Sequence, residues 1–488
     1  MTDSPVVTTA SGPVRGFWRD AGTPDASAAF LGIPFAKPPT GQRRFAAPVP
    51  PEPWTEPLDA TQYGATPLRI SGDDNLIPEP AVPGKSTLNV NVFTPDPDGS
   101  RPVLVWIHGG GFTEGSPASH WYDGARFNRD GVVTVSISYR LGFDGFGEIA
   151  GAPTNRGVRD WIAALEWVQQ NIAAFGGDPS RVTIGGQSAG GGAVLTLLGM
   201  PAAQHLFHRA IAISAALGDV PRETARERAE RLAALGGVSA DVEGYRSLTE
   251  KRIRQLQPQA ATPRKGIGFL QDVLTVGLPW GPVIDGELIE RPTVDSLARG
   301  IGADKPLLLG ATDDEFTMVA DDDASKFWWI PAGLLLRPFL RDGGIRRAWL
   351  RANKAQRPKG SVATAGRYVS DKVFRVLVPQ VAEARRGDGA DTWAYAFSWV
   401  SPVKKWACHC LDVPFWFDGL DREKVANLAG PHPPQTLADQ MHAAAVAMVA
   451  SGEPGWPAWS TTPGTARVFG GSGPDVTVDA YDSTLALL

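Results

Sequence analysis

One stretch of this chain, centred on Ser188, limits the possible folds more than any other. A β-branched run at 182–184 predicts a strand, an apolar run at 193–198 predicts a buried helix, and the pattern G-x-S-x-G lies between them. So sharp a strand-to-helix turn requires neighbours without a Cβ atom, and Gly186 and Gly190 meet that requirement. This context predicts an exposed, nucleophilic serine. A serine in a glycine-rich loop is the alternative, because the chain contains 55 glycines and the bare pattern also arises by chance.

The segments around this turn alternate between strands and helices. Runs of apolar and β-branched residues at 103–107, 132–138 and 210–214 predict strands, and the first of these has the continuous apolar character of a strand buried on both faces. Residues 158–175 carry apolar side chains at helical spacing and predict an amphipathic helix that packs on the core. Because alternating strands and helices form parallel sheets, we expect an α/β fold with a mostly parallel central sheet.

The length of the chain, 488 residues, exceeds that of most single domains. No linker, internal repeat or low-complexity segment divides it, so we expect one domain enlarged by insertions. Residues 219–260 predict surface helices, and residues 316–390 predict helices rich in aromatic side chains. The second segment includes Phe327, Trp328, Trp329 and Trp349, which either line a substrate gorge or pack in the interior.

Composition and charge exclude several classes of protein. The chain has 47 basic and 52 acidic residues, a net charge of −5 and no basic block, which argues against nucleic acid as a partner. No secretory signal and no apolar run long enough to span a membrane are recognisable. The two cysteines, Cys408 and Cys410, are too close in sequence for an unstrained disulfide. We expect a cytoplasmic protein, a monomer or small homo-oligomer; a mature form that has already lost a signal is the alternative.

A glycine-rich loop, His108-Gly-Gly-Gly-Phe112, directly follows the predicted strand at 103–107. Three consecutive glycines let the backbone approach a ligand closely and direct its amides outward. A plain turn would show the same residues. Together with the serine turn further along the chain, however, this pattern predicts the amides of an oxyanion hole in an esterase or lipase.

An acidic cluster, Asp313, Asp314 and Glu315, follows a short buried strand predicted at 306–310. In a parallel sheet, functional side chains collect beyond the carboxyl ends of the strands. Any of the three carboxylates is a candidate for the acid of a catalytic triad. A solvated acidic turn is the alternative for each of them.

The histidine of such a triad can be chosen by elimination among seven. Enzymes of this type place serine, acid and histidine in that chain order, which leaves His409, His432 and His442. His432 lies in a loop beside prolines, and His442 lies within a predicted amphipathic helix. His409 follows a predicted strand by one loop, as the chemistry requires. Its flanking cysteines suggest a metal site instead, but ligands so close in sequence rarely converge on one ion.

Segments spread over nearly the whole chain match the motifs of one family. They are F-L-G-I-P-F-A-K-P-P-T-G at 30–41, S-Y-R-L-G at 138–142, N-I-A-A-F-G-G-D-P at 171–179, L-L-L-G-A-T-D-D-E at 307–315 and C-H-C-L-D-V-P-F at 408–415. On these motifs the chain resembles the type-B carboxylesterases, the carboxylesterase/cholinesterase family, and among them the bacterial para-nitrobenzyl-esterase-like members. The resemblance implies an α/β-hydrolase fold with helical insertions, at about 219–275 and 316–390, that border the active-site gorge.

The resemblance also implies hydrolysis of small carboxylic esters to acid and alcohol, through an acyl-enzyme and without a metal or organic cofactor. It assigns roles residue by residue: nucleophile Ser188, acid Glu315, base His409, oxyanion-hole amides of Gly110, Gly111 and Ala189, and supporting positions Gln187 and Ser214. A non-catalytic interaction protein on the same fold is one alternative, although such relatives typically lose the serine or the histidine. An amidase or lactonase with the same triad is another.

The chain departs from the family pattern at three places. Gln187 replaces the glutamate that usually precedes the nucleophile, and we expect its side chain near the imidazole of His409. The family motif E-D-C-L is K-S-T-L here, and Lys85 replaces its glutamate. We therefore expect the usual ion pair between that glutamate and an arginine, here Arg44, to be lost. Phe316 replaces a glycine after the acid, and we expect it to reshape the local turn.

Overall fold

The computed structural model describes residues 4–23, 25–69, 75–262, 264, 271, 274, 277–320, 329–387 and 389–488. Across these residues no helix is both long and apolar enough to cross a membrane. Phe327 and Trp328, two of the candidates for lining a gorge, lie outside the described residues, and Trp329 is exposed. Trp349 is fully buried and donates its indole N–H to Asp371 at 3.0 Å, so it packs in the interior.

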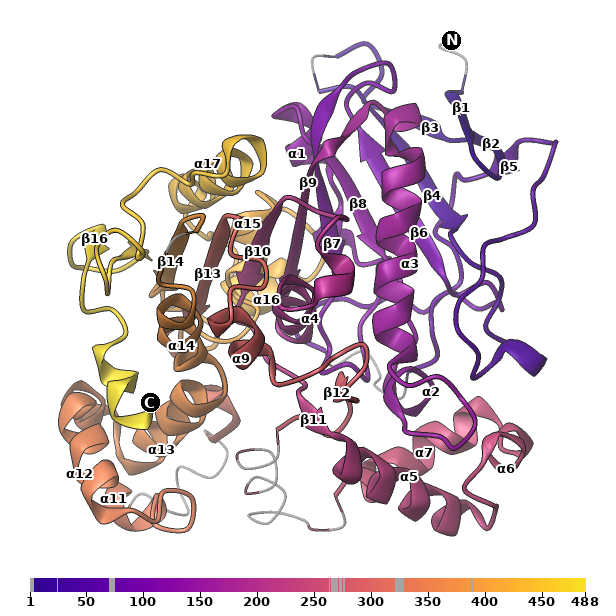
Figure 1. Cartoon of the computed structure of the whole chain (residues 1–488). Coiled ribbons are helices and arrows are strands. Elements are labelled where there is room, and N and C mark those ends of the chain that lie inside the picture. Colours follow the sequence, from indigo (N-terminus) through magenta and orange to yellow (C-terminus); the bar gives the residue numbers. More distant parts are fainter. Residues whose placement is uncertain are drawn as a thin grey trace.

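A large mixed sheet runs through the described part of the molecule (Figure 1). Its strands lie in the order β16-β15-β14-β13-β10-β9-β7-β8-β6-β4-β3. In chain order they are β3 (Phe17–Arg19), β4 (Ser27–Pro34), β6 (Asn89–Thr94), β7 (Arg101–Ile107), β8 (Val133–Ile137), β9 (Gly177–Gln187), β10 (Arg209–Ile213), β13 (Leu307–Thr312), β14 (Thr392–Phe397), β15 (Ala466–Phe469) and β16 (Val476–Thr477). The strands from β8 to β15 pair in parallel, whereas β3, β4, β6 and β16 pair antiparallel, which confirms the expected mostly parallel α/β sheet.

Two small sheets accompany the large one. The first contains β1 (Val6–Thr9), β2 (Gly12–Arg15) and β5 (Leu58–Asp59), and the second contains β11 (Val220–Pro221) and β12 (Val283–Ile284). The α-helices are α1 (Ala125–Arg129), α2 (Gly142–Phe146), α3 (Arg156–Asn171), α4 (Ala189–Leu198), α5 (Arg222–Gly236), α6 (Val242–Ser247), α7 (Glu250–Ala261), α9 (Thr293–Ala298), α11 (Ala332–Leu335), α12 (Gly343–Ala352), α13 (Ser361–Ser370), α14 (Leu377–Ala384), α15 (Val413–Trp416), α16 (Val425–Ala429) and α17 (Gln435–Ser451). A π-helical turn, Asp371–Arg375, joins α13 to α14.

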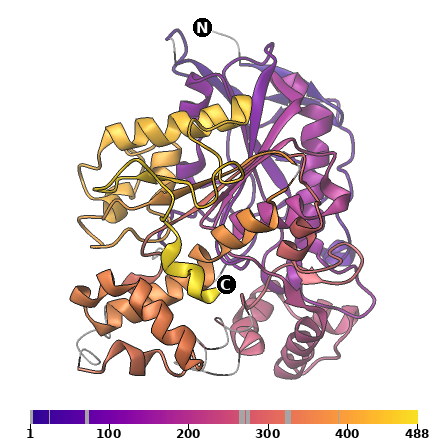
Figure 2. The same ribbon diagram turned by 60° about the vertical axis from the view of Figure 1, so that its left-hand side comes forward.

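Helices cover both faces of the sheet, and apolar side chains fill the two layers between them. Figure 2 shows α3, in magenta, and α17, in yellow, on opposite sides of the strands. On one side, Val158, Trp161 and Leu165 of α3 pack against β7, β8 and β9. On the other side, Met441 and Met448 of α17 belong to a second apolar layer, which includes Leu104 and Trp106 of β7 and further residues of β10, β13, β14 and β15. Burial on both faces explains why β7 reads as a continuous apolar run rather than an alternating one.

The two segments predicted as helical insertions do contain helices. The first contributes α5 to α7 and the second contributes α11 to α14. In Figure 1, α5 to α7 and α11 to α13 lie below the sheet, whereas α14 packs against β13 and β14. The two groups of helices follow β10 and β13 in the chain, so they leave the sheet at the carboxyl ends of parallel strands, where functional side chains of α/β proteins collect.

Candidate active site

Ser188 occupies a strained position between the end of β9 and the start of α4. Its φ of 60° and ψ of −124° are unusual for a residue with a side chain. The turn tolerates this only because of the glycines on either side. A Cβ atom on Gly186 would lie 2.4 Å from the carbonyl oxygen of Gly190, and one on Gly190 would lie 2.0 Å from that of Ile107. The predicted strand, sharp turn and helix are therefore present.

His409 and Glu315 meet in the interior behind this turn. The Nδ1 atom of His409 lies 2.5 Å from Oε2 of Glu315, and the amide of His409 donates to the carbonyl of Glu315 at 2.8 Å. The other carboxylate oxygen, Oε1, accepts a hydrogen bond from the amide of Thr312 at 2.8 Å. Both side chains are almost fully buried, 5% and 0% exposed. The carboxylate is thus fixed at both oxygens and orients the imidazole.

The two neighbouring aspartates point elsewhere. Asp313 binds Arg375 at 2.7 Å and accepts a hydrogen bond from the hydroxyl of Ser398 at 2.7 Å. Asp314 lies 3.7 Å from Arg367 and 3.6 Å from Lys359. Of the three carboxylates that the sequence left open, the structure brings only Glu315 to His409.

The carboxamide of Gln187 contacts the other nitrogen of the imidazole, as expected from its place beside the nucleophile. Its Nε2 atom lies 3.1 Å from Nε2 of His409 and 3.4 Å from the sulfur of Cys410, and the side chain is buried. Among the described residues the hydroxyl of Ser188 makes no hydrogen bond within 3.5 Å. Contacts between a nucleophile and its base are often loose before substrate binds.

The surroundings of His409 favour its charged form. Burial opposes protonation, but the Cys410 sulfur and the Glu315 carboxylate outweigh it and raise the pKa of His409 well above its usual range. Two aromatic rings also lie against the imidazole: the ring centres of Phe316 and Phe374 are 4.9 and 4.8 Å from that of His409. The phenylalanine that replaces the family glycine therefore packs on the imidazole. Phe374 comes from the π-helical turn, and no sequence pattern singled it out.

The glycine-rich loop lies directly against the serine turn. A Cβ atom on Gly109 would lie 2.7 Å from the carbonyl oxygen of Gln187 and 3.1 Å from Cβ of Ser188, so only glycine allows this approach. Gly110 and Gly111 have φ angles of 100° and 60°, and among the described residues neither amide donates a hydrogen bond within the protein. Ala189 is the first residue of α4, where amides have no acceptor within the helix.

His108 supports the loop from behind. Its ring stacks on that of Tyr139 with 4.5 Å between centres, and the Tyr139 hydroxyl donates to the carbonyl of His108 at 3.0 Å. Burial lowers the pKa of His108 to about 3, so the ring is neutral at physiological pH. The histidine of this motif is a structural residue here.

Ser214 and Arg44 complete the positions that the sequence singled out. Ser214 follows β10, beside the serine turn, and its buried hydroxyl has no hydrogen-bond partner among the described residues. Arg44 binds Asp144 at 2.8 Å and also donates to the carbonyl of Leu248 at 2.6 Å. Arg44 thus pairs with an aspartate of α2 in place of the family glutamate. The exposed Lys85 occupies the position of that glutamate.

Within the described ranges no group of three or more histidine, cysteine or acidic side chains is placed to hold a metal ion. Cys408 and Cys410 are both free and buried.

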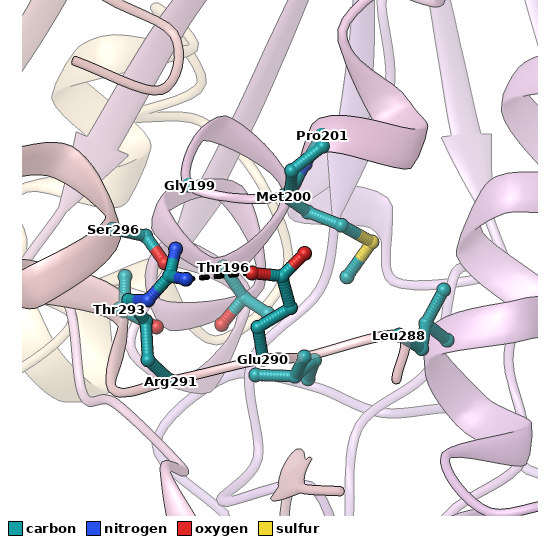
Figure 3. Close-up of a pocket in the computed structure, with 10 residues that line it drawn as sticks. Thr196, Gly199, Met200, Pro201, Leu288, Glu290, Arg291, Thr293 and Ser296 are labelled. Carbon is teal, nitrogen blue, oxygen red and sulfur yellow. Dashed lines mark hydrogen bonds and ion pairs between the residues drawn. The ribbon is translucent and has the colours of Figure 1, made fainter. Parts of the chain in front are cut away.

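A recess at the far end of α4 is separate from this site (Figure 3). It is lined by residues that include Thr196, Met200 and Ser296, and Glu290 and Arg291 form an ion pair of 2.7 Å beside it. Because α4 begins next to the nucleophile and rises about 1.5 Å per residue, the recess lies roughly 15 Å from it along the helix axis.

A parallel sheet with a serine turn, a glycine-rich loop and a histidine–glutamate pair at the carboxyl ends of its strands defines the class of α/β-hydrolases. Residues 3–465 match the family model described as the Carboxylesterase family, and the chain belongs to this family. The chain is accordingly a carboxylic ester hydrolase whose substrates are small-molecule esters.

Curated relatives and solved structures agree with this placement. The para-nitrobenzyl esterase of Bacillus subtilis (strain 168) is 32% identical over 486 residues, which cover 93% of this chain and 92% of that protein. The phenmedipham hydrolase of Pseudarthrobacter oxydans is 32% identical over 522 residues, 98% of each chain. A Geobacillus stearothermophilus carboxylesterase structure superposes with a TM-score of 0.81 at 33% identity, covering 95% of this chain and 96% of that one. A PNB esterase structure gives a TM-score of 0.83 at 29% identity, covering 99% of both chains.

Proposed function

We propose that this carboxylesterase acts through a triad of Ser188, His409 and Glu315. The observation that carries the proposal is the buried contact of 2.5 Å between Glu315 and Nδ1 of His409, on an imidazole whose other nitrogen faces the residue next to Ser188. Glu315 fixes the tautomer that leaves Nε2 as the base. When substrate arrives, Nε2 takes the proton of the Ser188 hydroxyl as its oxygen attacks the ester carbonyl.

The glycine-rich loop and the start of α4 supply the second part of the chemistry. Attack converts the carbonyl oxygen into an oxyanion, which the amides of Gly110, Gly111 and Ala189 bind. Such donors contribute ~3–4 kcal/mol each to transition-state binding in comparable sites. His409 then gives its proton to the departing alcohol, water repeats the sequence on the acyl-enzyme, and the acid is released. The end of β10 supports the serine turn, because the carbonyl of Ile213, the residue before Ser214, accepts a hydrogen bond from the amide of Ser188 at 2.9 Å.

The helical insertions border this site in the proposed arrangement of one domain over residues 1–488. Two contacts support that role. Arg254 of α7 donates to the carbonyl of Thr113, the residue after the glycine-rich loop, at 3.3 Å, and Phe374 beyond α13 packs on His409. The insertions at about 219–275 and 316–390 therefore supply the walls that select acyl and alcohol groups. A cytoplasmic location is part of the proposal, supported by two cysteines that are both free.

Pre-steady-state hydrolysis of a p-nitrophenyl ester series tests the mechanism and the selectivity together. An acyl-enzyme predicts a burst of p-nitrophenol equal to the enzyme concentration whenever deacylation is slower than acylation. The dependence of kcat/KM on acyl chain length then measures the depth of the acyl pocket. Two results together would contradict a covalent intermediate: a linear time course at every chain length, and no transfer of the acyl group to an added thiol or amine.

A further inference from the structure

A segment far from the triad in sequence binds Gly115, which lies three residues after the glycine-rich loop. The Oε2 atom of Glu79 accepts a hydrogen bond from the amide of Gly115 at 3.1 Å, and Nη1 of Arg69 donates to the carbonyl of the same glycine at 3.3 Å. Next to this contact, the hydroxyl of Ser116 donates to the carbonyl of Pro80 at 3.1 Å. Both polar groups of the Gly115 backbone are thus held by side chains of opposite charge.

Gly115 transmits this contact to the start of the loop. Its φ is +104°, and a Cβ atom there would lie 2.1 Å from Nδ1 of His108 and 2.3 Å from the carbonyl oxygen of Gly109. The residue before it, Glu114, donates its amide to the carbonyl of Gly110 at 2.8 Å. A displacement of Gly115 would therefore move the residues that carry the oxyanion-binding amides.

The Arg69–Glu79 pair is shielded from water. The two side chains are 5% and 10% exposed, Oε2 of Glu79 lies 3.6 Å from Nη1 of Arg69, and Asn75 also donates to that oxygen at 2.7 Å. Burial raises the pKa of Glu79 to about 7, although Arg69 opposes the rise. The other charged or titratable groups that face the pair are Glu114, Tyr122, Tyr139 and the neutral His108.

We propose that Arg69 and Glu79 are positioning residues for ester hydrolysis, because their ion pair fixes Gly115 and through it the glycine-rich loop. The inference rests on the proposed oxyanion role of Gly110 and Gly111. Donors that shift by a fraction of an ångström bind the oxyanion less well, whereas binding of the uncharged ester changes little. The pair therefore acts on kcat more than on KM.

Glu79→Gln tests this with steady-state kinetics on a neutral p-nitrophenyl ester. At about pH 9 we expect kcat to fall about tenfold, ~1.4 kcal/mol, with KM within about twofold. The ratio of native to variant kcat should fall toward one below pH 7, where the native carboxyl is itself neutral. Glu52→Gln, which removes an exposed glutamate paired with Lys37, is the matched control and should leave kcat unchanged at every pH. A ratio that is constant with pH, or no loss at alkaline pH, would overturn the proposal.

Asn75→Ala provides a second test that keeps the ion pair. Loss of this donor disfavours the ionised carboxylate, so the pKa of Glu79 should rise. The ratio of native to Asn75→Ala kcat should then exceed one only between two pH values, the pKa of Glu79 in the native protein and its higher pKa in the variant. Below and above this window the ratio should return to one. An unchanged profile would refute a role for the Glu79 charge. An organophosphonate should still label Ser188 in each variant, only more slowly; absence of labelling in the native protein would instead refute the triad.

Discussion

The carboxamide nitrogen of Gln187 lies 3.1 Å from Nε2 of His409, the atom that accepts the proton of Ser188 in the proposed triad. Because an amide N–H donates, this contact favours the neutral imidazole with its lone pair on Nε2, and it therefore opposes the rise in the pKa of His409 that Cys410 and Glu315 cause. A glutamate at the same place would accept from Nε2–H and stabilise the imidazolium instead. The residue at position 187 thus influences which protonation state of His409 is favoured.

Gln187→Glu should move the acidic limb of the pH profile of kcat/KM to higher pH. A carboxylate beside the imidazole favours its charged form, and we expect a rise of about one unit in the apparent pKa of the base. The variant should also lower KM for a cationic ester relative to a neutral ester of the same shape. Gln62→Glu, a change of the same kind at an exposed position, is the control and should leave the limb in place. A limb that does not move in Gln187→Glu would show that the carboxamide has no electrostatic influence on His409.

Glu315→Gln should lower kcat by roughly 10⁴, the loss that follows when the orienting acid of a triad becomes an amide. Asp313→Asn and Asp314→Asn should keep kcat of the folded protein within about tenfold, below ~1.4 kcal/mol, because their partners are arginine and lysine side chains rather than His409. Kinetics with active-site titration of each variant would make the comparison per folded molecule. The reverse order of losses would transfer the role of the acid to an aspartate.

Asp130→Asn should reduce stability more at neutral pH than in strong acid. His442 places Nε2 3.0 Å from Asp130 and Nδ1 2.9 Å from the carbonyl of Trp416. Its hydrogen bond, with that of Arg129, holds the pKa of Asp130 well below its usual range despite partial burial. A carboxyl group whose pKa is lower in the folded state than in the unfolded state stabilises the protein at every pH above its unfolded-state pKa of about 3.9. This stabilisation is lost as the pH falls through the folded-state pKa.

The side chain of Asp130 is 35% exposed, so the loss at pH 7 should be at most about 1 kcal/mol. Chemical denaturation at neutral pH and at about pH 2 measures the difference in the free energy of unfolding between the native protein and the variant. Asp20→Asn, at an exposed aspartate, serves as the control. Equal destabilisation at both pH values would show that shape rather than charge is responsible.

The residues of the site that could be predicted from the sequence are those fixed by local geometry. The turn at Ser188 has a strict glycine requirement, and the loop at 108–112 follows a recognisable buried strand. Chain order left three histidines, of which His409 alone follows a predicted strand by one loop, and the family motif selected Glu315 among three carboxylates. In each case the signal lies within a few residues of the functional group, and the structure places all four features together at one edge of the sheet.

Contacts between distant, unpatterned segments could not be predicted in this way. Phe374 reaches His409 from a π-helical turn, and nothing in its own sequence marks that turn. We expected Arg44 to lose the ion pair that the family makes with a glutamate. Its partner here is Asp144, and that contact depends on how α2 packs. The contact of Glu79 with Gly115 joins segments that are 36 positions apart. Such pairs follow from the packing of the whole chain rather than from the pattern of any one element.

We infer that Ser188 is the nucleophile of this carboxylesterase. The most direct measurement is the intact mass and peptide map of the native protein after reaction with an organophosphonate ester, alongside Ser188→Ala treated identically. We predict one adduct per chain, located on Ser188, with loss of esterase activity in proportion to labelling and neither adduct nor activity in the variant. Stoichiometric labelling of Ser188→Ala, or undiminished ester hydrolysis by that variant, would contradict the account.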